Sequence, residues 1–178
     1  SSKEEAAKRE RAIYSKFVDQ AYNLRSDIEG MGKVISMLDF YSSLSYLAKE
    51  CNWVKPVMVE NGEVDIKDGR HPVVESNTER YVPNSFSTNK SRFSLITGPN
   101  MAGKSTYLRE IALIVLLSHI GSFVPATKAI IPITDKIFCR VGASDNLSKG
   151  ESTFLIEMSE SAQILRSITD KSLVIMDE

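Results

Sequence analysis

The sequence predicts an α/β fold in which a sheet flanked by helices follows an α-helical segment. Residues 1–50 place apolar side chains at helical spacing among charged ones. Residues 91–178 alternate strand-like and helix-like runs, a pattern that predicts a mostly parallel sheet. Between the first of these strands and its helix, Gly98–Ser105 fits the phosphate-binding pattern G-x-x-x-x-G-K-[ST].

Composition narrows the class of protein. The chain has 178 residues, 42% of them hydrophobic, enough for one core with an appendage. Its 22 basic and 23 acidic residues give a net charge of −1, which argues against a dedicated nucleic-acid-binding domain. Cys51 and Cys139 lack metal-ligand spacing, so we predict reduced, buried thiols. The longest apolar run, Ile111–Leu117, is too short for a membrane span, and no signal segment opens the chain. We therefore expect a cytoplasmic protein with no membrane partner.

The first fifty residues predict two helices. A helical stripe in the first is formed by Ala6, Ile13, Phe17, Ala21 and Leu24. Gly30 and Gly32 interrupt the pattern, and a second helix is expected from about Lys33 to Glu50. We interpret the stripe as a packing face, and the polar remainder of the first helix as the end of a longer arm.

Residues 56–86 predict short strands separated by turns. Asn61-Gly62 and Asp68-Gly69 are turn signals. His71 precedes a proline and is expected in an extended bend. Nothing nearby in the sequence would tune its pKa, so a structural role is favoured over a catalytic one. Residues 81–84 predict another extended piece.

The remaining elements follow the β-loop-α order. They are a strand at 93–97, a helix at 107–120 ended by Gly121, a strand pair at 129–134 and 136–142, a helix at 153–168 and a strand at 173–178.

The glycine-rich loop predicts nucleotide binding. Gly98 and Gly103 allow a tight backbone path that aims N–H groups at phosphate oxygens. The helix starting near Lys104 turns its positive end toward the same anion. We expect the Lys104 ammonium to reach the β- and γ-phosphates of ATP or ADP and the Ser105 hydroxyl to reach Mg²⁺. We also expect Pro99, Asn100, Met101 and Ala102 of this loop to contact the nucleotide.

The last strand carries two adjacent carboxylates, Asp177 and Glu178. Buried acids need a cation, a proton or a metal as partner, because their desolvation is costly. An apolar strand ending in Asp is the Walker B element of P-loop enzymes, and we expect it beside the P-loop strand. Asp177 would then lie by the Mg²⁺ held by Ser105, through water. Glu178 would orient or deprotonate the attacking water, which favours hydrolysis over binding alone.

The residues around the loop resemble a particular family. The stretches LITGPNMAGKSTYLREIALI, IGSFVPA, FCRVGASDNLSKGESTFLIEM and LVIMDE closely resemble the ATPase domain of the MutS family of DNA mismatch-recognition proteins. GRHPVVE and YVPN resemble the segments that precede that domain. The family belongs to the ABC-type ATPases, which act as dimers with two composite ATP sites.

The resemblance implies further site residues. Triphosphate and Mg²⁺ would be contacted by Asn100, Met101, Gly103, Lys104, Ser105 and Thr106. Tyr81 matches an aromatic position that stacks on adenine, where the family more often has Phe. Ser152 matches a signature-loop serine that reaches the γ-phosphate bound in the opposite subunit. As an alternative, Ser152 is a helix N-cap, because it precedes a helical run.

The resemblance also implies an organisation. Residues 1–52 would form a helical lever end and connector, and residues 53–178 the N-terminal part of a P-loop ATPase domain, truncated after Walker B. In the parent protein, ATP would drive a homodimeric clamp that engages mismatched DNA and downstream repair proteins through other domains. An incomplete sheet would leave strand edges open. We therefore expect weak nucleotide binding, little or no hydrolysis and self-association from the fragment alone.

Three other interpretations remain. A small-molecule kinase should carry an arginine-bearing lid, and none is visible. A transporter ATPase should have the usual glycine-rich signature where this chain has SKGESTF. An interaction module with a vestigial P-loop is disfavoured for the parent by the intact Lys104, Ser105, Asp177 and Glu178, and stays open for this chain alone.

Overall fold

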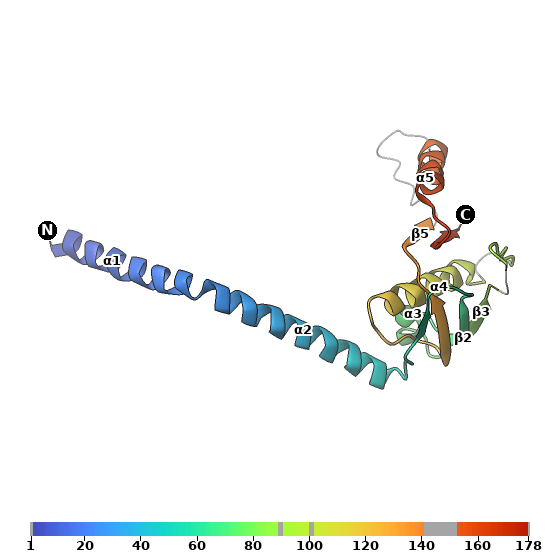
Figure 1. The fold of residues 1–178 in the computed structure, drawn as a ribbon, viewed down its shortest axis with the longest axis horizontal. Helices are drawn as coiled ribbons and strands as arrows, with labels where there is room; N and C mark the ends of the chain where they lie inside the picture. The colour runs from blue at the N-terminus through green and yellow to red at the C-terminus, as the bar shows by residue number, and fades with distance from the viewer. Residues whose placement is uncertain (1, 89–90, 100–101, 141–152, 178) are drawn as a thin grey trace. The chain divides into compact units, whose positions relative to one another are not determined.

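The computed structural model describes residues 2–88, 91–99, 102–140 and 153–177 (Figure 1). The elements are α1 (Ser2–Asn23), α2 (Arg25–Glu50), β1 (Val57–Val59), β2 (Asp65–Gly69), α3 (Pro72–Ser76), β3 (Asn84–Ser87), α4 (Lys104–His119), β4 (Lys128–Pro132), β5 (Lys136–Arg140), α5 (Thr153–Ser167) and β6 (Ser172–Met176). They fall into two compact units, residues 1–44 and residues 45–178.

The helical unit breaks at a different place from the one predicted. Gly30 and Gly32 lie inside α2, and the break falls at Leu24. The Leu24 N–H is shared between the carbonyls of Gln20 and Ala21, at 3.3 and 3.2 Å, as at a tightened helix end. A glycine inside a helix costs only about 1 kcal/mol relative to alanine, which longer helical sequence on both sides overcomes. Every described residue from 2 to 43 is exposed, so the apolar stripe has no buried member in this unit.

The larger sheet is mixed, which corrects the expectation of a mostly parallel one. Its strand order is β1-β4-β2-β3, with β1 parallel to β4 and β2 antiparallel to both neighbours. Asn61 and Gly62 lie in a bend between β1 and β2, and Gly62 has a φ of +142°. Asp68-Gly69 is not a turn. It forms an irregularity in the β2–β3 ladder, with Asp68 at a φ of +48°.

The smaller sheet pairs β5 with β6 in parallel, from Lys136 opposite Ser172 to Arg140 opposite Met176. The predicted pairing of 129–134 with 136–142 is therefore wrong, because β4 joins the first sheet and β5 the second.

Residues 93–97 form no strand in the structure. The predicted P-loop strand beside β6 is therefore absent from the described residues, where β6 has β5 as its ladder partner. A strand is stable only when neighbours take up its backbone hydrogen bonds, and a purely local pattern does not supply them. Phe93 and Leu95 are accordingly 77% and 78% exposed.

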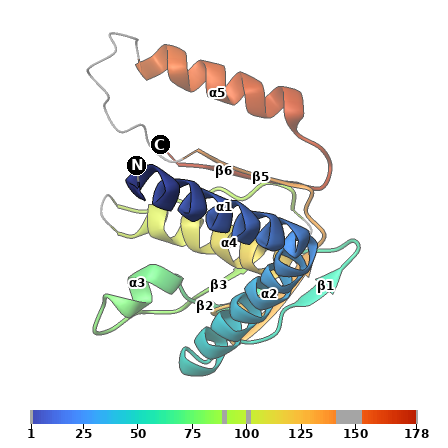
Figure 2. The same ribbon diagram turned by 90° about the vertical axis from the view of Figure 1, so that its left-hand side faces the viewer.

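Helix α4 is the centre of the core. It contacts β2 on one side and the β5–β6 pair on the other (Figure 2). The core is formed by Val64, Ile66, Ile111, Ile114, Val115, Val124, Ala126, Ala129 and Ile131. Gly121, with a φ of +81°, follows the end of α4 as predicted. Helix α5 and strand β6 also lie where the sequence predicts them.

Both cysteines are free, as predicted, but they are not buried. Cys51 is half-buried, and Cys139 is exposed on β5, a strand of the two-stranded sheet. None of the helices in the described ranges is both long enough and apolar enough to cross a membrane.

Candidate nucleotide-binding site

The phosphate loop leads into an uncapped helix. Gly103 stands at the N-cap of α4 with a φ of +87°, a left-handed conformation that favours glycine, and no side chain caps the helix there. The first N–H groups of α4 are thus not satisfied by a capping side chain. Together with the helix dipole, they form an environment that suits an anion.

Lys104 folds back onto the loop that precedes it. Its Nζ atom donates to the carbonyl oxygen of Gly98 at 2.8 Å. The Ala102 N–H closes the loop onto the carbonyl of Pro99 at 3.4 Å. The ammonium group is therefore held beside the loop by one neutral acceptor, which a phosphate oxygen can replace with a charged one.

Ser105 and Thr106 follow in the first turn of α4, and both are half-buried. Within the described ranges, no side chain or backbone group takes the Ser105 hydroxyl in a hydrogen bond. Asn100 and Met101, expected to contact the triphosphate, lie outside the described residues, as do Ser152 and Glu178.

Asp177 directly follows β6 and is half-buried. Its N–H donates to the carbonyl of Arg140 at 2.8 Å and so extends the β5–β6 ladder by one residue. Burial raises the pKa of the Cys139 thiol, the Arg109 charge on α4 lowers it, and the Asp177 carboxylate raises it. Asp177 and Arg109 therefore lie within electrostatic reach of the same thiol, which brings the end of β6 near α4.

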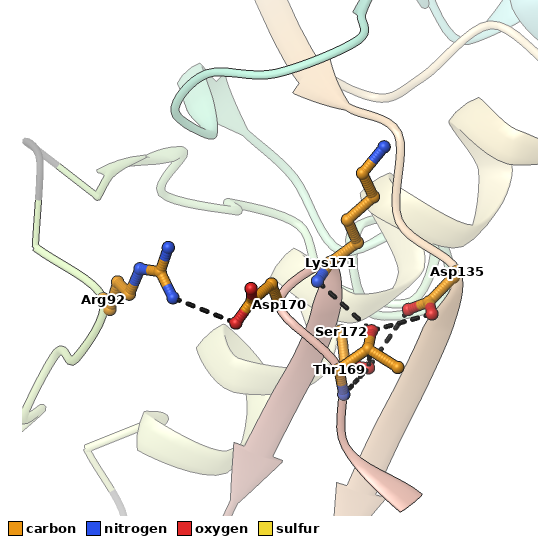
Figure 3. Close-up of polar contacts among 6 residues, drawn as sticks. All are labelled: Arg92, Asp135, Thr169, Asp170, Lys171 and Ser172. Atoms are coloured by element: carbon orange, nitrogen blue, oxygen red, sulfur yellow. Dashed lines mark hydrogen bonds and ion pairs between the residues drawn. The ribbon is translucent and has the colours of Figure 1, made fainter.

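A polar cluster fixes the starts of strands β5 and β6, at the end of this sheet opposite to Asp177 (Figure 3). The Asp135 carboxylate accepts from the Thr169 hydroxyl at 2.7 Å and from the Ser172 hydroxyl at 3.1 Å. The Asp135 N–H donates to the carbonyl of Lys171 at 3.3 Å. The Thr169 hydrogen bond is the main reason why the pKa of Asp135 lies below its ordinary value. The turn before β6 is thereby tied to the residue before β5, which sets the register that carries Asp177.

The same turn meets the segment that leads into the loop. Arg92 Nη1 lies 3.3 Å from Asp170 Oδ1 (Figure 3). Both side chains are almost fully exposed, so this pair contributes little to stability. It shows that the chain enters the P-loop segment from beside the start of β6.

Tyr81 lies against α4 and not in open solvent. Its hydroxyl donates to Glu110 Oε2 at 2.5 Å. Burial and this hydrogen bond raise the pKa of Tyr81 to about 12, so the hydroxyl is a neutral donor at physiological pH. Burial raises the pKa of Glu110, whose residue is only 1% exposed, and the Tyr81 hydrogen bond opposes that rise.

Comparison with known proteins decides the family. The model of MutS domain V matches residues 94–178. The chain is 51% identical over 173 residues to the DNA mismatch repair protein MutS of Borreliella burgdorferi (strain ZS7), covering 95% of this chain and 20% of that protein. The chain belongs to the MutS family.

Two further MutS proteins have similar identities. The chain is 50% identical over 169 residues to that of Lawsonia intracellularis, covering 93% of this chain and 19% of that protein. It is 49% identical over 170 residues to that of Clostridioides difficile (strain 630), covering 93% and 18%. The chain thus spans about a fifth of the length of these MutS relatives. The resemblance inferred from the loop and its flanking segments is confirmed.

Magnesium fits the residues of this MutS site that the structure describes. Hydroxyl and carboxylate oxygens are the ligands that Mg²⁺ prefers, and Ser105 and Asp177 supply one of each. In the described ranges neither side chain is engaged in a hydrogen bond or ion pair. No three His, Cys, Asp or Glu residues gather there into a metal site of their own. A site of this composition needs the phosphates of the nucleotide to complete it.

Sequence reasoning missed Glu110. The signal was present, since Glu110 shares its helix face with Tyr107 and Ile114, at spacings of three and four. An acid on an apolar face predicts a buried partner. For His71 the structural role is confirmed: its Nδ1 atom accepts from the N–H groups of Val73 and Val74, each at 3.3 Å, and caps α3.

Proposed function

We propose that this chain is the ATP-binding and ATP-hydrolysing part of a MutS-type DNA mismatch repair protein. The observation that carries the proposal is the uncapped start of α4, where Lys104 rests on the carbonyl of Gly98. An anion bound there would meet the uncapped N–H groups of α4 and the Lys104 ammonium. Membership of the MutS family supports ATP as the nucleotide.

Each residue of the site has a role in the proposal. Lys104 exchanges the Gly98 carbonyl for a β- or γ-phosphate oxygen, and backbone N–H groups of the loop, with Asn100, Met101 and Thr106, hold the remaining oxygens. Ser105 and Asp177 hold Mg²⁺, which when bound neutralises charge on the phosphates. Glu178 orients the attacking water and takes its proton.

The composite-site organisation is also part of the proposal. Ser152 would reach the γ-phosphate bound by a second subunit, so two chains complete each other's sites. Residues 1–52 would act as lever end and connector between ATP and a DNA clamp. The net charge of −1 supports contacts with mismatched DNA and downstream repair proteins through other parts of the full-length protein. Turnover by the 178-residue chain alone would be slow, because phosphoryl transfer depends on groups from two subunits.

Calorimetric titration with Mg-ATP and Mg-ADP tests the binding step. We expect saturable binding by the chain and at least a tenfold loss of affinity in Lys104→Ala, because a charge-assisted hydrogen bond to phosphate is removed. Lys33→Ala is the matched control, since Lys33 is an exposed lysine of α2. Equal affinity of Lys104→Ala and the wild type would contradict the proposal, as would absence of binding by the folded wild type.

A further inference from the structure

Tyr81 and Glu110 form a buried polar pair that the phosphate chemistry does not require. Glu110 follows Lys104 by six residues on α4, about 9 Å along the helix axis. A carboxyl group in an apolar core costs several kcal/mol unless it is hydrogen-bonded. Here the Tyr81 hydroxyl provides that hydrogen bond, at 2.5 Å. The core around Glu110 is apolar and includes Ile111 and Ile114, so an apolar residue would pack at this position as well.

Glu110 is held on its other side by backbone. A Cβ atom placed on Gly69 would lie 2.5 Å from Glu110 Oε1 and 3.0 Å from the carbonyl oxygen of Asn84. Glycine at position 69 therefore leaves the space that Glu110 fills. The carboxyl group is wedged between β2, the start of β3 and α4, which restricts where the Tyr81 hydroxyl can be held.

The backbone of His71, two residues after Gly69, also influences the hydroxyl. Burial and Glu110 raise the pKa of Tyr81, whereas the backbone of His71 lowers it. The hydroxyl is thus approached from α4 and from the β2–α3 connection. The residue is half-buried, so its polar tip is fixed inside while part of the side chain stays accessible.

We propose that Glu110 is a positioning residue for the nucleotide base. By holding the hydroxyl of Tyr81 from α4, it fixes the Tyr81 ring, to which the MutS resemblance assigns stacking on adenine, relative to the start of the same helix. A phenylalanine ring at position 81 would lack this tether. The inference rests on the proposed ATP site and adds a determinant of base binding to it.

Two ligands separate base binding from phosphate binding. Mg-ATP carries both groups, and Mg-tripolyphosphate carries the phosphates alone. Tyr81→Ala should weaken Mg-ATP binding about five- to 150-fold, the effect of losing one base–aromatic stack, and should leave tripolyphosphate affinity within about twofold.

Glu110→Leu tests the tether itself. We expect it to weaken Mg-ATP about threefold or more, within the range set by Tyr81→Ala, with tripolyphosphate affinity again unchanged. Glu110→Gln, whose amide oxygen still accepts from Tyr81, should recover most of the affinity lost in Glu110→Leu. If Glu110→Leu does not fold, Tyr81→Phe replaces it, because that variant keeps the ring and removes only the hydroxyl.

The outcomes are distinct. Equal losses of Mg-ATP and tripolyphosphate affinity in folded Glu110→Leu would mean a purely structural role and overturn the inference. Unchanged Mg-ATP affinity in that variant, with a loss in Tyr81→Ala, would overturn it as well. Should the folded wild type bind neither ligand, the proposed function itself fails, and the inference with it.

Discussion

The two units of the chain use apolar residues in opposite ways. In residues 1–44, the large side chains of α1 and α2 are exposed, including Ile13 at 59% and Phe17 at 65%. In residues 45–178, Ile114 and Val115 of α4 are fully buried. Both regions show helical periodicity in sequence. An apolar stripe therefore predicts a helix and its apolar face. It does not predict whether the same unit contains the surface that covers this face.

The forces that hold the two units differ accordingly. In the first unit, ion pairs such as that of Arg25 with Glu29, at 2.7 Å, join exposed residues four apart on one helix. Such exposed pairs contribute only about 0.3–0.5 kcal/mol each. In the second unit, stability comes from burial against two sheets.

The largest expected effect on stability comes from replacing isoleucine by alanine in the second unit, with the same replacement in the first unit as the comparison. Ile114→Ala removes a fully buried side chain and should lower the free energy of unfolding by about 2–5 kcal/mol. Ile13→Ala, on exposed α1, should change it by no more than about 0.5 kcal/mol. Urea unfolding followed by fluorescence of Trp53, the single tryptophan, reports on the second unit, and circular dichroism follows both. A loss above 1 kcal/mol in Ile13→Ala would show that the stripe of α1 is packed in solution.

This comparison also explains which parts of the fold the sequence could predict. Helices α4 and α5 and strand β6 follow from local periodicity, and Gly103 at the start of α4 follows from a motif with a fixed chemical purpose. The family could be predicted because its residues around the loop are distinctive.

Pairing between strands could not be predicted in the same way. Strand β4 precedes β5 by only a few residues, yet it joins β1 and β2, and its Ala129 and Ile131 pack in the same core as α4. Residues 93–97 have strand composition without a ladder partner. Partner choice depends on contacts distant in sequence, which a periodic pattern does not encode.

In the candidate site, too, the features set by a local motif could be predicted and those set by contacts distant in sequence could not. The left-handed Gly103 and the position of Lys104 in the first turn of α4 could be predicted, because the motif fixes them locally. The Tyr81–Glu110 pair could not, since it joins residues 29 positions apart. Only the burial of Glu110 was open to prediction, from its helix face.

Alanine substitutions at Gly69 and at Gly30 should have opposite effects on stability. Gly69→Ala should destabilise the second unit by about 1–3 kcal/mol, because its Cβ atom would lie 2.5 Å from Glu110 Oε1 and 3.0 Å from backbone. Gly30→Ala should stabilise α2 by about 0.5–1 kcal/mol, because nothing lies within 4 Å and alanine is the better helix former.

Thermal unfolding monitored by circular dichroism, with hydrogen exchange of the α2 amides, measures both effects. Stability changes of opposite sign would confirm that the backbone is crowded at Gly69 and open at Gly30. Stability changes of the same sign would contradict this expectation. A loss of stability in Gly30→Ala would mean that α2 is covered or kinked at Gly30.

The smallest effect concerns the cap of α3. Replacing His71, which is 8% exposed, by alanine removes the acceptor of the Val73 and Val74 N–H groups and should cost about 0.5–2 kcal/mol at pH 7.5. Burial lowers the pKa of His71, with Arg109 acting in the same direction and a backbone hydrogen bond opposing. The folded protein therefore binds the His71 proton less well than the unfolded chain does. This contribution to stability is intact above pH about 6.5 and decreases as the pH falls below it.

Glu110 acts in the opposite sense, because its raised pKa makes the folded protein the better proton acceptor as the solution is acidified. The pH dependence of the wild type thus mixes two contributions, and a variant must separate them. His71→Asn keeps a side-chain acceptor at the N-cap and does not titrate. Between pH 7.5 and 5.5, urea unfolding should show a smaller loss, or a larger gain, of stability in His71→Asn than in the wild type. Parallel curves would mean that the His71 pKa is the same in the folded and unfolded chain, and that the cap bears no charge-dependent cost.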